Sequence, residues 1–154
     1  MEVMVLKSGL LRITNSNYIN MLLQPRITKF RKSRKGKLRR LEFKTNKLRF
    51  GELGLKAKLA GLITARQLES ARRTIARKIK RKGKIWICIF PNLPITSKPT
   101  EARMGKGKGA VSHWVARVRG GTTLFEVCGI PNHLAVEALR SGSKKLPIQT
   151  KIFD

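Results

Sequence analysis

The sequence predicts an α+β domain in which a mixed or antiparallel sheet packs against two helices, preceded by a basic extended N-terminal arm. Three observations lead to this fold class. The chain has 154 residues, the length of a single domain. Strand-like runs and two helix-like runs follow residue 47, and the first helix has one apolar stripe. The bases are concentrated ahead of the first strand.

The net charge of the chain indicates which kind of partner it binds. Lys and Arg number 35 against 8 Asp and Glu, a formal net charge of +27. Such a chain repels itself, whereas a phosphate backbone neutralises it and releases condensed counterions. We therefore expect a nucleic-acid partner. Membrane insertion is not expected, because the longest apolar run, Ile85 to Phe90, is far shorter than the ~20 residues of a spanning helix.

The distribution of bases predicts three segments. Residues 1–20 form an N-terminal extension with few charges, and residues 48–154 form the globular domain. Residues 21–47 form a basic arm without a sustained apolar period, which we expect to be extended and ordered mainly by RNA. A solvated tail is the alternative. The arm bases assigned to RNA binding are Arg26, Lys29, Arg31, Lys32, Arg34, Lys35, Lys37, Arg39 and Arg40.

The first half of the globular domain contains a strand or hairpin and then a helix. Leu48–Leu59 alternates loosely and carries glycines, as in a strand or hairpin with irregular backbone. Ile63–Lys82 is predicted to be a helix, with Thr64 and Gln67 as a capping box and Gly83 as the terminator. Its apolar stripe consists of Leu68, Ala71, Ile75 and Ile79.

The remaining surface of this helix is crowded with bases. Like charges four residues apart each cost a few tenths of a kcal/mol, and only Glu69 offsets them, at Arg73. This face is therefore expected to meet phosphates, a merely solvated surface being the alternative. The bases assigned to RNA here and just after the helix are Arg66, Arg72, Arg73, Arg77, Lys80, Arg81 and Lys84.

The second half of the domain is predicted from turn residues. Lys84–Phe90 is expected to be a strand, and residues 91–109, with three prolines, a long loop. Gly120-Gly121 predicts a hairpin between strands at Ser112–Arg119 and Thr122–Cys128. A helix over Pro131–Ser141 follows, with Leu134, Ala135, Ala138 and Leu139 inward and Gly142 as terminator, and then a strand over Ile148–Phe153.

The end of the long loop offers backbone without side chains. It lacks the spacing and the strand-to-helix context of a nucleotide-binding loop, so no nucleotide site is expected. Its amide groups can instead approach phosphates closely while its bases supply charge. A flexible loop without contacts is the alternative. The residues concerned are Arg103, Met104, Gly105, Lys106, Gly107, Lys108 and Gly109.

Residues for catalysis or metal binding are not grouped along the chain. The eight acids are scattered singly, and neither His113 nor His133 adjoins a recognisable nucleophile elbow. Cys88 and Cys128 lie in apolar runs and are interpreted as buried thiols. Zinc ligation would need closely spaced pairs of Cys and His. We therefore expect no enzyme, no metal and no cofactor.

Several short runs of the sequence form a recognisable set of motifs. They are Met21 to Lys32, Thr64-Ala65-Arg66-Gln67, Gly83-Lys84-Ile85-Trp86-Ile87, Phe90-Pro91, Pro94-Ile95-Thr96, Lys98-Pro99, Arg103 to Gly109, and Lys145-Leu146-Pro147-Ile148. Together they resemble the bacterial and organelle type of the L-sixteen family of large-subunit ribosomal proteins, and the resemblance covers about residues 21–153.

The resemblance implies an α/β-hammerhead-like fold and a structural role in the large subunit. It implies binding to large-subunit rRNA beside the aminoacyl-tRNA site, with the arm, here Arg26 to Arg40, and the loop Arg103 to Gly109 near the peptidyl transferase centre and tRNA. Neighbouring large-subunit proteins are further expected partners, and no homo-oligomer is expected. A general architectural nucleic-acid-binding protein is the alternative function.

The compartment is predicted from departures from the family pattern. The extension 1–20, and Cys88 where many relatives carry a base, suggest an organelle version. Lys- and Ile-rich usage is compatible with an AT-rich organelle genome. The expected location is a mitochondrial ribosome, with a plastid or the bacterial cytoplasm as alternatives.

Overall fold

The computed structural model describes residues 11–12 and 23–154, and this part of the chain has two helices and two antiparallel sheets. The predicted α+β class is confirmed. The helices are α1 (Ala65–Lys78) and α2 (Asn132–Ser143). The strands are β1 (Leu11–Arg12), β2 (Leu53–Ala57), β3 (Gly61–Thr64), β4 (Lys84–Ile87), β5 (Leu93–Ser97), β6 (Ala110–Val118), β7 (Thr123–Cys128) and β8 (Thr150–Phe153).

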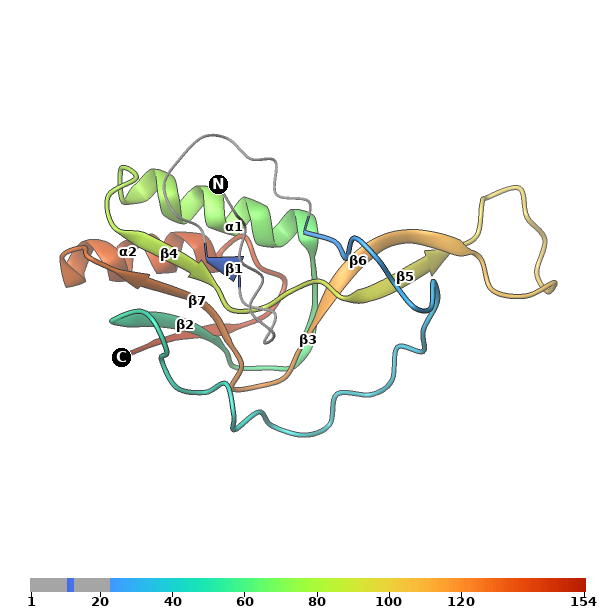
Figure 1. The fold of residues 1–154 in the computed structure, drawn as a ribbon, viewed down its shortest axis with the longest axis horizontal. Helices are drawn as coiled ribbons and strands as arrows, with labels where there is room; N and C mark the ends of the chain where they lie inside the picture. Colours follow the sequence, from blue (N-terminus) through green and yellow to red (C-terminus); the bar gives the residue numbers. More distant parts are fainter. Residues whose placement is uncertain (1–10, 13–22) are drawn as a thin grey trace.

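The two sheets divide the molecule into a body and a projection (Figure 1). The body is the five-stranded sheet β1-β4-β7-β2-β8 with α1 and α2 packed together on one side. The projection is the three-stranded sheet β3-β6-β5, and the loop between β5 and β6 extends from its far end. This arrangement holds the glycine-rich loop away from the core.

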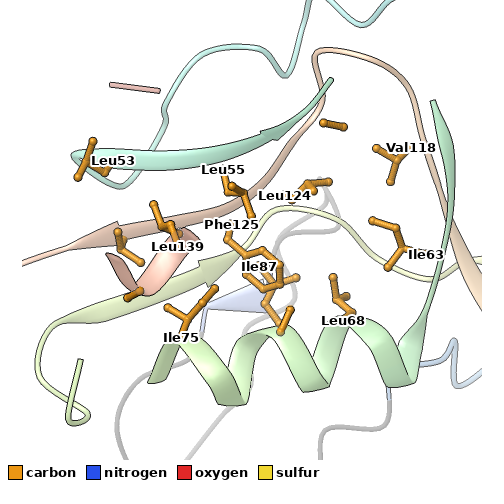
Figure 2. Close-up of a cluster of buried hydrophobic side chains, with 14 of the residues drawn as sticks. Leu53, Leu55, Ile63, Leu68, Ile75, Ile87, Val118, Leu124, Phe125 and Leu139 are labelled. Carbon is orange, nitrogen blue, oxygen red and sulfur yellow. The ribbon is translucent and has the colours of Figure 1, made fainter. Parts of the chain in front are cut away.

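The hydrophobic core lies between the helices and the five-stranded sheet (Figure 2). The predicted stripe is buried at all four positions, three in α1 and Ile79 just after it, and Ile75 faces Ile87 of β4 and Leu139 of α2. The predicted capping box is also present, because Thr64 and Gln67 make both of its hydrogen bonds. Short-range sequence signals therefore located this helix correctly.

The predicted hairpin at Gly120-Gly121 is wrong. The chain does turn there, but β6 pairs with β3 and β5, whereas β7 pairs with β2 and β4 in the other sheet. Gly121 has a φ of 94° and donates its N–H to the Ala57 carbonyl over 2.8 Å. The chain crosses from one sheet to the other at the glycine pair, because β6 and β7 each pair with two other strands in different sheets.

Two further predictions need correction. The helix expected over Ile63–Lys82 is shorter at both ends, because residues 61–64 pair with β6 and because Lys80 and Arg81 have positive φ angles. The loop expected over residues 91–109 contains β5. Pro94 is tolerated in this strand because β5 is at the edge of its sheet, where one side of the backbone needs no donor.

Gly142 was predicted to end the second helix, but it lies within α2 and is buried. A Cβ atom at this position would lie 2.5 Å from Cγ1 of Ile75, which is a fully buried residue of α1. The absence of a side chain thus permits the close approach of the two helices. This glycine serves packing between elements instead of termination of its own helix.

We expect Gly142→Val to destabilise the protein by about 1–3 kcal/mol, because the new side chain must displace Ile75 in a dense core. The free energy of unfolding from urea titration would measure the effect. Ser141→Val, one position away and half-buried, is the control for β-branching in a helix. Equal losses in the two variants would contradict a specific helix-to-helix contact.

Candidate nucleic-acid interface

The basic arm lies on the surface of the projection and then of the body (Figure 1). Each predicted arm base from Arg26 to Arg40 is exposed. After these bases the backbone docks on the folded domain: the Glu42 N–H donates to the Gly120 carbonyl over 2.9 Å, and Thr123 donates to the Thr45 carbonyl over 3.0 Å. The arm therefore presents its charges from an anchored backbone.

Glu126 anchors the segment that directly follows the arm, at residues 49–51, and the sequence analysis did not identify it. Its carboxylate is 1% exposed and accepts N–H groups from Phe50 at 2.8 Å and from Gly51 at 2.9 Å. It also accepts the N–H of Arg49 at 3.2 Å. A buried charge requires such donors. The signal available in the sequence was an acid inside the otherwise apolar run of β7.

The arm and the glycine-rich loop are joined by two lysines. Nζ of Lys32 donates to the Lys108 carbonyl over 2.7 Å, and Nζ of Lys108 donates to the Ser33 carbonyl over 2.5 Å. Two segments that are some seventy-five residues apart in the sequence thus form one basic region. We call it the arm–loop surface, consisting of Arg31, Lys32, Ser33, Arg34 and residues 103–109.

The tip of this surface has an unusual backbone. Gly105, Lys106 and Gly107 have φ angles of 90°, 51° and 85°, and a Cβ atom at either glycine would meet nothing within 4 Å. Glycine is needed here for the left-handed conformation and not for internal packing. The open space allows another molecule to approach the backbone amides, which is the property expected of a phosphate-binding loop.

Helix α1 lies on the opposite side of the body from the part of the arm that leads into β2 (Figure 1). Arg66 and Arg77 of α1 are exposed, and so is Lys80 just after it. Arg72 and Arg73 each pair with Glu69 at 2.8 Å, where the sequence predicted only the second pair. The predicted RNA-binding bases therefore form two regions, and part of the α1 charge is offset within the helix.

The Glu69 carboxylate is kept ionised by its two arginines. Partial burial raises the pKa of Glu69, but hydrogen bonds and charges from Arg72 and Arg73 together outweigh burial and lower the pKa below its ordinary 4.5. A carboxyl group with a lowered folded-state pKa contributes stability above its unfolded pKa and loses it as pH falls through the folded value. The contribution is thus complete at neutral pH.

We expect Glu69→Gln to lower the free energy of unfolding at pH 7 by roughly 0.5–1 kcal/mol, since both ion pairs are partly exposed. The difference from the unsubstituted protein should shrink below about pH 4.5 as Glu69 becomes protonated. Urea titrations across this range would test the expectation. A difference that is the same at every pH would contradict it.

The described residues offer little for covalent chemistry. Burial, followed by the nearby Glu126 carboxylate, raises the pKa of the Cys88 thiol. A hydrogen bond to Glu52 raises the pKa of the Cys128 thiol. Both thiols were predicted to be buried, but both are only half-buried. Over residues 11–12 and 23–154, no three His, Cys, Asp or Glu residues are grouped to hold a metal ion. No helix in this part of the chain is long and apolar enough to cross a membrane.

Comparison with known proteins identifies the class to which this basic α+β fold belongs. A large ribosomal subunit protein uL16 of Francisella tularensis subsp. holarctica is 54% identical over 133 residues, covering 86% of this chain and 97% of that protein. The protein of the same description from Bartonella henselae is 55% identical over 132 residues, covering 86% and 96%. The class is thus a structural component of the large ribosomal subunit, not an enzyme.

Residues 25–153 match the family described as ribosomal protein L16p/L10e, and the chain belongs to this family. The resemblance that the motifs indicated is therefore confirmed, and so is the expectation of a ribosomal protein used in translation. The similar proteins reported above are bacterial. The family match covers the arm from residue 25 onward, the loop and the strands from β2 to β8, so the interface described above lies within the matched region.

Proposed function

We propose that the protein binds large-subunit rRNA and helps to shape the aminoacyl-tRNA site near the peptidyl transferase centre. The observation that carries this proposal is the joining of the arm to the loop through Lys32 and Lys108. The motif resemblance implies that both segments reach the same region of the ribosome. The arm and the loop contact each other in this chain and so form one surface. On this proposal the part of that surface from Arg103 to Gly109 meets tRNA.

The two basic regions support a position between RNA elements. The arm–loop surface would contact rRNA at the projection, and the exposed bases of α1 together with Lys84 would contact it at the body. Contacts on several sides would neutralise the net charge of +27 more completely than one flat patch. On this proposal residues 21–47 are the RNA-binding arm, residues 48–154 are the globular domain, and residues 1–20, mostly outside the described residues, are an extension.

Cross-linking within the large subunit would test the proposed contacts. Ultraviolet irradiation of subunits carrying tRNA in the aminoacyl site should link peptides from residues 26–40 to rRNA, and peptides from residues 103–109 to rRNA or tRNA. Peptides from residues 144–151, after α2, are the internal control. Recovery of nucleotides on the control peptides but not on the arm or loop would contradict the proposal.

We further propose that this ribosome is mitochondrial. The support is the extension, the Lys- and Ile-rich composition and Cys88 in place of a base, as the motif comparison indicated. Fractionation of isolated organelles and cytoplasm on sucrose gradients, with mass spectrometry of each fraction, would test the location. Co-sedimentation with large subunits of a plastid or of a bacterial cytoplasm would contradict it.

A further inference from the structure

A pocket lies where the arm passes the three-stranded sheet. Its volume is about 240 Å³. The arm contributes Lys35, Gly36 and Leu38 to its lining, and the start of β3 contributes Gly61 and Leu62, together with Ala60 just before it. Only Lys35 among these belongs to the bases assigned to RNA. The folded position of the arm creates this pocket, because the two lining segments are separated along the chain.

The pocket walls are largely apolar although they are on the surface of a highly basic protein. Leu62 is 37% exposed and Leu38 is half-buried. Gly36 has a φ of 65°, and a Cβ atom on Gly61 would lie 2.4 Å from Cγ2 of Ile148, so the fold requires a glycine at both positions. The shape is thus set by the backbone, and the apolar walls remain open to a ligand.

Cations border the apolar walls. Lys35 lines the pocket, and the guanidinium of Arg117 lies against Gly36, with Nη2 only 2.9 Å from the place a Cβ atom would take. None of the lining residues is acidic. An apolar hollow with a cationic border matches a nucleotide, whose base has two apolar faces and whose phosphate is anionic. A purely apolar peptide would leave these cations unpaired.

We propose that this pocket holds the base of one unpaired nucleotide of the large-subunit rRNA, with an adjoining phosphate at Lys35 and Arg117. The proposal rests on the proposed rRNA binding and adds a site for a single-stranded nucleotide to it. The base contacts Leu38 and Leu62, and the arm closes over it. Base contact, unlike phosphate contact, involves no release of counterions.

Two leucine substitutions in the full chain separate this site from its surroundings. Leu62→Ser changes the pocket, whereas Leu59→Ser changes a leucine that is 55% exposed and does not line it. The probe is large-subunit rRNA extracted from ribosomes that contain this chain, titrated at several salt concentrations. We expect Leu62→Ser to weaken binding roughly 5- to 10-fold, because part of the apolar contact with the base is lost, with an unchanged salt slope. Leu59→Ser should stay within about twofold, because Leu59 does not line the pocket.

Lys35→Gln provides the complementary measurement, and its salt slope should fall by about 0.7–0.9 because one phosphate contact is lost. Equal affinities of the two serine variants, at equal melting temperatures, would overturn the pocket proposal. The proposal would also be overturned if Leu62→Ser bound rRNA more weakly and with a shallower salt slope. It would be overturned as well if Leu62→Ser bound rRNA normally but failed to enter the subunit, because that result would indicate that a protein occupies the pocket. Failure of the unsubstituted chain to bind rRNA would overturn the proposed function itself.

Discussion

Neutralising four bases of the arm–loop surface should weaken rRNA binding by on the order of 10²–10³-fold at physiological salt. The variant combines Arg31→Gln, Arg34→Gln, Arg103→Gln and Lys106→Gln, all at exposed positions. It leaves Lys32 and Lys108 in place, so the arm remains joined to the loop. The salt slope should decrease by about 3–4, because each lost phosphate contact removes 0.7–0.9.

A charge-matched control distinguishes local contacts from overall attraction. Arg140, Lys144, Lys145 and Lys151 are also exposed and lie in or after α2, outside the predicted interface. Changing these four to Gln lowers the net charge equally, so long-range attraction is reduced by the same amount. If both variants lost affinity and slope to the same extent, binding would depend on total charge, as expected of a general architectural protein.

Removal of the Glu126 side chain should have the largest effect on stability, about 3–5 kcal/mol for Glu126→Ala. The carboxylate accepts hydrogen bonds from the backbone of residues 49–51, and its loss would leave those N–H groups without their acceptor next to a cavity. Such a loss is a large share of the 5–15 kcal/mol that typically stabilises a domain. The midpoint and slope of urea unfolding would measure it.

Glu126→Gln is the matched control. The amide has the same shape, and its oxygen can still accept from Phe50 and Gly51, so a smaller loss is expected. In Glu126→Ala, residues 49–51 would detach from the domain, and Phe50 would leave its stacked position on Trp86. Cleavage of the arm and of this segment by protease should therefore be faster. Equal stability of the alanine and glutamine variants would show that the carboxylate does not hold this segment.

Signals that act within a few residues predicted their elements correctly. Thr64 and Gln67 predicted the start of α1, and the four-residue stripe predicted its buried face. Charge and the motifs at Arg103 to Gly109 led to the family, because composition and short motifs require no knowledge of the fold. Helix capping and apolar periodicity depend on residues only three or four positions apart, so a short stretch of sequence contains all the residues that interact.

The sequence by itself therefore determined the fold class, the capped start and buried face of the first helix, and the family of this protein. Only the tertiary structure decided that Gly120-Gly121 joins two sheets, that Gly142 lets α1 and α2 approach closely, and that Glu126 holds the backbone of residues 49–51. It also brought Lys32 to Lys108. Each of these features depends on residues distant in the chain, whose proximity is set by the packing of the two sheets and helices and not by any local pattern.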